Sequence, residues 1–352
     1  MSRRDDRRGV VLLVVLFFTL LLAASITSFV RRATVDSLVA RNRDHAAQAM
    51  ALARGGVRIA QALLLEDRLD EGTNAVGPLD THLDLWARIG DMPFEAGAGR
   101  LRLRIQDAGA KFNLNALFET DDEGLRTPRA ETESFLLLFF EKIIDELPLP
   151  PGERALYDVR DLTANLIDWV DGDEVRRHGG AEDDYYQAQD PPYFAANQPL
   201  LALDELRLIE GFDGPLVEGL APYVTVYPYA PGGCGHAGVG CGVNLNTAPP
   251  HVLALLFYDD GVDLRLADED VVRDLLELRE EGSGVCGADQ SLDGCTPISE
   301  IVTNAIFPPP SISSQIFIVS AEAEVGEVRR TVEAVVDRTR PTEPRLLSWR
   351  VR

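Results

Sequence analysis

Carboxylate side chains gather in one short stretch near the middle of the chain. Between residues 168 and 184 there are seven of them: Asp168, Asp171, Asp173, Glu174, Glu182, Asp183 and Asp184. Like charges at this density repel one another unless a cation or a basic side chain offsets them. Arg176, Arg177 and His178 lie in the same stretch and are candidates for that role. Oxygen-rich loops also suit Ca²⁺, which takes about 6–8 oxygen ligands.

Two interpretations of the acidic stretch stay open on the residues alone. In the first, Asp171 and Asp173, with Asp168 before them and Glu182 and Asp183 after them, supply calcium ligands from two sides of one loop. In the second, the stretch is a solvated acidic loop that follows a helix. The stretch is not an EF-hand, because Gly172 separates the two aspartates and no Glu closes a loop of that type.

The cysteines form two local pairs in glycine-rich segments. Cys234 and Cys241 lie in one segment, and Cys286 and Cys295 lie in the other. In an oxidising compartment this spacing predicts two disulfides that each close a small loop. A zinc site is the alternative, but the CxxC spacing is missing and His236 is the only histidine nearby.

The N-terminus carries a short Arg-rich leader followed by an apolar run. The run from Val10 to Val30 contains no charged residue and matches the ~20 residues that a helix needs to cross a bilayer. It is longer than the roughly 7–15 apolar residues of a signal peptide. The basic leader should stay in the cytoplasm. A cleaved signal, a permanent anchor and the assembly helix of a pilin-like subunit are the competing interpretations.

The helical pattern continues well beyond the apolar run, without a proline, to about residue 69. Apolar side chains recur mostly three or four residues apart: Val35, Leu38, Val39, Ala46, Met50, Ala53, Val57, Ala60 and Leu64. Such spacing predicts a helix with one apolar face. A helix that is half lipid-embedded and half amphipathic suits a filament subunit, and we expect the apolar face to pack on partner helices.

The rest of the chain reads as β, then helical, then β again. Charged and apolar residues alternate from Arg100 to Asp107, helix patterns dominate from about 120 to 220, and two alternating strands flank Gly326. Two N-L-N segments, at Asn113 and Asn244, predict a repeated side-chain cap. The tail contains Pro341 and Pro344, and we expect it to be mobile.

These elements predict an α+β fold, in which a pilin-like antiparallel β domain is interrupted by a large helical (SAM-like) insertion. The expected segments are a leader (1–9), a transmembrane and assembly helix (10–70), a first α+β part (71–118), the helical insertion with the acidic loop (119–222), a second α+β part with a helix-hairpin-helix-like segment and the final hairpin (223–338), and a tail (339–352).

Several segments, taken in order, resemble one family. The leader with Gly9 and the continuous N-terminal helix come first. KFNLNALF (111–118), LIDWVDGDEVRRHGGAEDDYYQ (166–187), PPYFAANQPLLALDELRLIEGF (191–212) and VNLNTAPPHVLALL (243–256) follow. Together they are similar to the minor pseudopilins of the K type from type II secretion systems. The resemblance covers about residues 7 to 338.

The resemblance implies processing, place and partners. Prepilin peptidase would cleave after Gly9 and methylate the new N-terminus, Val10. The finished protein would sit in the inner membrane by a single span, with its soluble part in the periplasm. It would form a tip complex with the I-type and J-type minor pseudopilins, prime pseudopilus assembly and so support export across the outer membrane. The resemblance also favours calcium at the acidic loop.

One departure from ordinary pilins fits the K type. Most pilins carry Glu at the fifth mature position, where it is thought to pair with the N-terminal amine of the subunit above. Here that position is Val14, and the K type characteristically lacks the acid. A subunit at the tip has no neighbour above it, so an unpaired carboxylate in lipid would be costly.

Three rival functions fit the sequence less well. A plain membrane-anchored periplasmic scaffold would keep its leader. A helix-hairpin-helix DNA-binding protein is disfavoured because the chain has a net charge of −23 and because Asp259 and Asp260 stand where a hairpin should approach phosphate. An enzyme built on Asp168 and Asp171 lacks a nameable nucleophile with its base. We therefore predict a structural protein that binds no nucleic acid.

Overall fold

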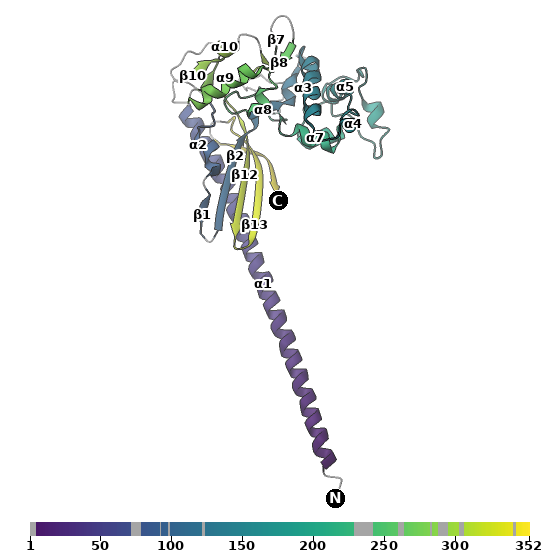
Figure 1. Ribbon diagram of the computed structural model, residues 1–352, viewed down its shortest axis with the longest axis vertical. Helices are drawn as coiled ribbons and strands as arrows, with labels where there is room; N and C mark the ends of the chain where they lie inside the picture. The colour runs from purple at the N-terminus through teal and green to yellow at the C-terminus, as the bar shows by residue number, and fades with distance from the viewer. Residues whose placement is uncertain are drawn as a thin grey trace.

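The structure is a computed structural model that describes residues 5–71, 79–91, 93–97, 99–121, 124–228, 242–259, 264–281, 284–287, 295–302, 306–340 and 343–352. A single long helix projects beyond a sheet and a head that together hold all other elements (Figure 1). The N-terminus lies at the far end of this helix, and the C-terminus lies beside the sheet (Figure 1).

The long helix α1 runs without a break over Asp5–Glu71. Its first half is exposed along its length, and the most apolar part is not buried against any of the described chain. In its second half Ala53, Val57, Ala60 and Leu64 are fully buried. They pack against strands of the chain's own sheet, so the expectation that this whole face contacts partner helices is wrong for these residues. Val35, Leu38 and Val39 remain exposed.

Five antiparallel strands form the sheet under α1, in the order β1-β2-β12-β13-β14. The strands are β1 (Phe94–Ala96), β2 (Gly99–Asp107), β12 (Ile316–Val325), β13 (Val328–Asp337) and β14 (Arg345–Val351). In β2 buried and exposed residues alternate along the strand, as its sequence predicts. Gly326 turns the β12–β13 hairpin with a φ of +60°, a conformation that glycine adopts without strain.

The C-terminal tail forms a strand, so the expectation of a mobile tail is wrong. β14 pairs with β13 from Arg345 opposite Asp337 to Val351 opposite Val332. Pro344 precedes the strand, where its missing N–H costs no ladder bond. Proline in the tail therefore marks the start of an edge strand rather than disorder.

The head inserts between β2 and β12 in the chain. Its longer helices are α3 (Thr132–Glu146), α5 (Val159–Val170), α7 (Gly214–Leu220) and α9 (Glu269–Glu280). Its short helical segments are η2 (Ala108–Ala110), η3 (Leu114–Leu117), α4 (Pro151–Arg154), α6 (Asp183–Tyr186), η4 (Leu203–Leu208), α8 (Pro250–Leu253) and α10 (Ile298–Ile301). The segments α2 (Leu85–Arg88) and η1 (Ile89–Asp91) precede β2 and pack against the sheet. Short strands are β3 (Phe112–Asn113), β4 (Phe118–Thr120), β5 (Arg126–Pro128), β6 (Val224–Thr225), β7 (Phe257–Asp259), β8 (Leu264–Leu266), β9 (Gly284–Cys286), β10 (Cys295–Pro297) and β11 (Ile306–Phe307).

One hydrophobic core serves the whole head. It joins α3 and α5 to residues from the 243–307 segment, and Phe135 contacts Phe257 and Phe307 with ring centroids 5.8 and 6.0 Å apart. The packing therefore groups residues 112–307 together, across the boundary at residue 222 that the sequence pattern predicts. The sheet with α1 has its own, separate core.

The two N-L-N segments form the same cap. The side chain of Asn113 accepts a hydrogen bond from the Asn115 backbone at 3.0 Å, and Asn244 does the same for Asn246 at 3.0 Å. The second asparagine of each segment then bonds a distant chain segment, at Leu200 in one case and Val285 in the other. The predicted structural role of these asparagines is confirmed.

A buried arginine holds α1, the head and the sheet together. Arg338 follows β13, is 1% exposed, and lies 2.5 Å from Asp67 of α1 and 2.5 Å from Asp80. The Asp80 carboxylate also accepts a hydrogen bond from the Ser314 backbone at 2.6 Å. Breaking a buried pair by removing one partner leaves an uncompensated charge, so this junction resists separation.

We predict that Leu64→Ala lowers the free energy of unfolding by about 2–5 kcal/mol, because it removes a fully buried side chain between α1 and the sheet. Leu69→Ala, in the same helix, should change it by less than about 0.5 kcal/mol because Leu69 is exposed. Urea denaturation of the full chain in detergent, followed by tryptophan fluorescence, measures both. Equal effects would contradict the packing of α1.

Candidate cation site in the acidic loop

Helix α5 brings two acidic side chains to the floor of the acidic loop. The helix starts at Asp158, whose carboxylate accepts hydrogen bonds from the Arg160 and Asp161 backbones, and it ends at Val170. Its buried face anchors it in the head core. Because Asp168 and Asp171 sit at its C-terminal end, the same packing takes both carboxylates out of water, with side chains 0% exposed.

Arg177 neutralises part of this charge. Its Nη1 lies 3.3 Å from Asp168 Oδ1 and 2.9 Å from Asp171 Oδ2, and its backbone N–H donates to Asp168 Oδ2 at 3.0 Å. Asp168 is thus held by two contacts to one residue, one to each carboxylate oxygen. The proposal that a nearby basic residue offsets the acidic stretch is confirmed for Arg177.

Asp171 also converges with two further carboxylates, those of Asp173 and Glu182. Ligand atoms of Asp171, Asp173 and Glu182 all lie within 4.8 Å of one another. One oxygen of Asp171 and both oxygens of Glu182 are buried and accept no hydrogen bond from the described chain. Buried polar atoms are normally paired. Converging carboxylates with buried oxygens that lack a hydrogen bond are the arrangement that a hard cation would satisfy.

The raised pKa values of the clustered carboxylates also favour a cation site. Burial raises the pKa of Asp171 to about 7, and the negative charges of Asp173 and Asp168 add to this rise while Arg177 opposes it. Burial raises the pKa of Glu182 to about 8, again with help from Asp168, Asp171 and Asp173. The ionised cluster is therefore costly by itself, and a bound cation would favour the ionised form.

Glycines let the loop close over these carboxylates. A Cβ on Gly180 would lie 1.9 Å from Asp168 Oδ2, so no larger residue fits there. Gly179 has a φ of +84°, which L-residues rarely adopt. The HGG segment is thus explained by close approach to α5, which its sequence alone did not reveal.

Two of the five predicted ligands lie elsewhere. Both carboxylate oxygens of Asp168 accept hydrogen bonds from Arg177. Asp183 caps another segment, because its carboxylate accepts a hydrogen bond from the Ala195 backbone at 2.9 Å. Asp184 pairs with Arg176 at 3.1 Å on the surface. The structure brings together Asp171, Asp173 and Glu182 out of the predicted set.

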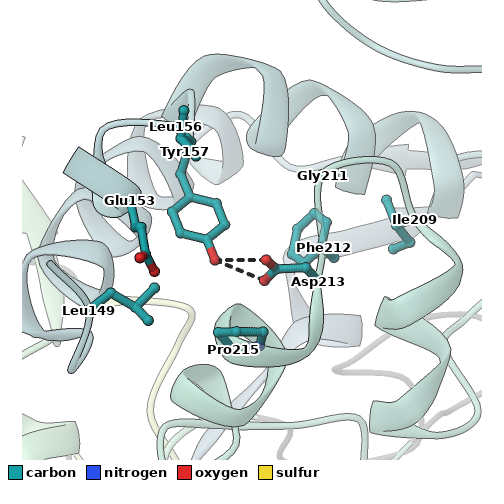
Figure 2. Close-up of a pocket in the computed structure, with 9 residues that line it drawn as sticks. All are labelled: Leu149, Glu153, Leu156, Tyr157, Ile209, Gly211, Phe212, Asp213 and Pro215. Atoms are coloured by element: carbon teal, nitrogen blue, oxygen red, sulfur yellow. Dashed lines mark hydrogen bonds between the residues drawn. The ribbon is translucent and has the colours of Figure 1, made fainter. Parts of the chain in front are cut away.

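A pocket on another part of the head was not expected from the sequence. It has a volume of about 570 Å³ and lies between α4 and the segment before α7. In it the Tyr157 hydroxyl donates to Asp213, whose two oxygens lie 2.8 and 3.0 Å away (Figure 2). Burial and the Asp213 charge raise the pKa of Tyr157 to about 12. Tyr157 therefore stays protonated at neutral pH and fixes the two segments to each other.

One predicted disulfide is confirmed. Cys286 and Cys295 are bonded, with Cα atoms 5.7 Å apart, and they join β9 to β10. Neither sulfur is then free to bind zinc. Cys234 and Cys241 lie outside the described residues, so their pairing stays a prediction.

Comparison with known proteins points to one family. The family model described as "Type II secretion system (T2SS), protein K" matches residues 110–229. The chain is 38% identical to the type II secretion system protein K of Klebsiella pneumoniae over 66% of this chain and 63% of that protein. It is 32% identical to the Aeromonas hydrophila protein K over 71% of this chain and 70% of that protein.

A solved structure has the same fold. The crystal structure of the GspK-GspI-GspJ complex from the type 2 secretion system of enterotoxigenic Escherichia coli contains a chain that matches with a TM-score of 0.58. The match covers 89% of this chain and 99% of that chain at 21% identity. The fold class expected from the sequence is thereby confirmed. On the strength of the sequence relatives, the chain belongs to the type II secretion system protein K family.

Proposed function

We propose that this protein is a minor pseudopilin that caps the tip of the type II secretion pseudopilus and primes its assembly. The observation that carries the proposal is the division of α1. In one half, a stretch of 18 residues has a mean hydropathy of 2.8 and no burial, so it is apolar enough to cross a membrane. The other half forms the core of a sheet domain. A helix that is both anchor and core can pass from membrane to filament without refolding.

The leader and the apolar start of α1 together support cleavage by prepilin peptidase. Cleavage after Gly9 would leave Val10 as the N-terminus of an apolar segment with no charged residue before Arg31. Val14 then occupies the fifth position, where a carboxylate without a partner would be costly in lipid. This arrangement suits a subunit with nothing stacked above it, held in the inner membrane by a single span with its head in the periplasm.

The head supplies the shape of a cap. It extends sideways from the top of the sheet, well beyond the width of α1 (Figure 1). A further subunit stacked along the axis of α1 would meet this mass. We assign the I-type and J-type minor pseudopilins as the partners, which fits the composition named for the solved complex that contains the same fold. The role is structural, without a reaction of its own.

We also propose calcium at the acidic loop, with Asp171, Asp173 and Glu182 as the carboxylate ligands. The support is the convergence of their oxygens within 4.8 Å and the three buried oxygens that lack a hydrogen bond. A bound ion would tie α5 to the start of α6, which flank the loop. The ion is expected to stabilise the head rather than take part in chemistry.

The processing proposal predicts an N-terminus at Val10 when the chain is co-expressed with prepilin peptidase. Gly9→Val should leave the leader attached, because a β-branched side chain obstructs close approach of a protease to the backbone. Intact mass measures the loss of residues 1–9 directly. A mature protein that keeps Met1 would indicate a plain anchored scaffold, and one that starts inside the apolar run would indicate an ordinary exported protein.

The tip proposal predicts that Leu38→Asp reduces co-purification with the I-type and J-type subunits from detergent-solubilised membranes, because Leu38 is exposed and apolar. Ser37→Asp introduces the same charge one residue away, on the flank that faces away from the apolar stripe, and should have little effect. Loss in both variants or in neither would contradict packing through the apolar stripe of α1.

The calcium proposal predicts that Ca²⁺ raises the melting temperature of the full chain and that a chelator reverses the rise. At 100 times the dissociation constant the stabilisation should be about 2.7 kcal/mol. Glu182→Gln should abolish the response while leaving the ion-free protein as stable as before or more so, because it removes one of three repelling carboxylates.

Asp184→Asn is the matched control, because it removes a carboxylate from the same loop that is exposed and lies outside the cluster. It should retain the full calcium response. An unchanged response in Glu182→Gln, or a flat response in the wild type, would rule out the site.

A further inference from the structure

The face of the sheet that carries α1 is only partly covered. α1 lies over β2, β12 and β13. Trp86 of α2 covers the β2 side, with its ring 4.9 Å from that of Phe317. On the opposite side the sheet continues into β14, near the C-terminus (Figure 1). No described helix lies over β14 with more than marginal contact.

Side chains of β14 extend the core face into solvent. Leu346, Trp349 and Val351 stand opposite Val336, Ala334 and Val332 of β13, which belong to the core beneath α1. Directly opposed residues in an antiparallel pair point to the same face of the sheet. The three β14 side chains therefore face the α1 side, yet they are 45%, 40% and 45% exposed. A half-exposed tryptophan between two aliphatic side chains is typical of an interface anchor.

One flank of α1 forms the wall beside these residues. Arg54 lies over the Trp349 ring, with its Cζ 5.9 Å from the centroid, and Gln61 donates to the Pro344 carbonyl at 2.8 Å. Exposed residues at helical spacing on the same flank are Ala47, Ala51 and Arg58. We call the surface made by Leu346, Trp349, Val351 and this flank of α1 the open lane.

The open lane has room for one helix. Five strands at ~4.8 Å spacing make a sheet about 19 Å wide, and packed helices lie about 8–10 Å apart. With α1 over the middle and α2 over one side, a second long helix fits beside α1 over β14. The alanines on the flank of α1 permit a close approach by such a helix.

The charge of the open lane is opposite to that of the whole protein. The chain has a net charge of −23, but α1 contains no acidic residue between His45 and Leu65. Arg330 stands opposite Ala323, a core residue, and so points to the same face of the sheet. Within the described part of the chain, no ion pair involves Arg54, Arg58 or Arg330. The open lane is thus apolar, and around it lie three guanidinium groups whose charge no described carboxylate offsets in an ion pair.

We propose that the open lane binds an amphipathic helix that carries carboxylates and belongs to a neighbouring pseudopilin subunit, with Trp349 as the anchor. The inference rests on the proposed tip function and names the surface that serves it. The partner's apolar side chains would cover the three β14 residues, and its carboxylates would meet the arginines. Aromatic residues and arginines are the types that dominate such contacts.

Other occupants fit less well. The edge of β14 is irregular, because its register shifts opposite Val335 and Val336, and a bulged edge discourages the addition of a further strand. The α1 helix of a second copy would place Arg54 and Arg58 against the same residues. Like charges across an interface oppose binding, so a helix of different, acidic character is favoured.

The test compares binding of the I-type and J-type subunits to the full chain in detergent. Trp349→Ala, and separately Arg54→Glu with Arg58→Glu, should weaken binding roughly tenfold or more. Arg350→Glu is the control, because Arg350 neighbours Trp349 but lies on the opposite face, beside Asp204. It should bind as the wild type does. Rising salt should weaken the wild type more than the double charge variant.

A photo-crosslinking residue at position 349 identifies the occupant. A crosslink to an acid-bearing helix of the I-type or J-type subunit, absent when the probe is at position 350, supports the proposal. If wild type and variants bind equally well, the open lane is not the contact, although the tip function stands. If the wild type binds neither subunit, both proposals fail. A crosslink to a second copy of this chain overturns the assigned occupant.

Discussion

The burial of one face of α1 against the sheet is the contact on which the rest of the structure depends. Ala53, Val57, Ala60 and Leu64 give the sheet its core, and without them the inner faces of β2, β12 and β13 would lie open to water. Small residues dominate this face of the helix. At Gly56 a Cβ would come within 2.9 Å of Ala321, so the helix and sheet approach as closely as their backbones allow. The same helix continues into its exposed apolar half without a break.

The head is attached to this unit by a small apolar cluster of Ala108, Ile316 and Val335 and by buried polar contacts. At one point the buried pair of Arg338 and Asp80 bonds Ser314 at the end of the head: Arg338 donates to the Ser314 carbonyl at 3.0 Å, and Asp80 accepts from the Ser314 backbone N–H at 2.6 Å. At another, the buried Asp107 at the end of β2 accepts hydrogen bonds from Asn244 at 3.0 Å and Thr247 at 2.5 Å. Burial raises the pKa of Asp107, and these donors oppose the rise. Directional bonds of this kind fix the orientation of the head. If one partner is removed, the other is left buried without a hydrogen bond, which destabilises the fold.

Local pattern predicted the elements well and their pairing less well. The long helix, the alternating strand at β2, the hairpin at Gly326 and the Cys286–Cys295 bond were all readable from nearby residues. The strand in the tail was not predicted, because β14 forms by pairing with the edge of β13. The proline content of the tail carries no information about that pairing. The apolar face of α1 was correctly located, but periodicity cannot say whether the covering surface belongs to the same chain or to another.

In the acidic loop, too, the sequence does not show which side chains contact one another. Composition identified the stretch, yet Asp168 and Asp183 look equivalent to Asp171 and Glu182 in the sequence. Their roles diverge because Arg177 bonds both oxygens of Asp168 but only one of Asp171. Asp183 is set apart because its carboxylate accepts a hydrogen bond from the Ala195 backbone, twelve residues away. Gly180 is required because the loop backbone passes close to the Asp168 carboxylate. The sequence shows the glycine, but only the structure shows that Asp168 lies next to it.

Hydrogen exchange of the processed protein in lipid nanodiscs tests the divided role of α1 most directly. The account predicts two protected segments in one continuous helix: the apolar run, protected by lipid, and residues 53–64, protected by the sheet. The exposed stretch between them, around residues 35–44, should exchange faster, because neither lipid nor the sheet covers it. Fast exchange over residues 53–64 in the folded protein would contradict the account.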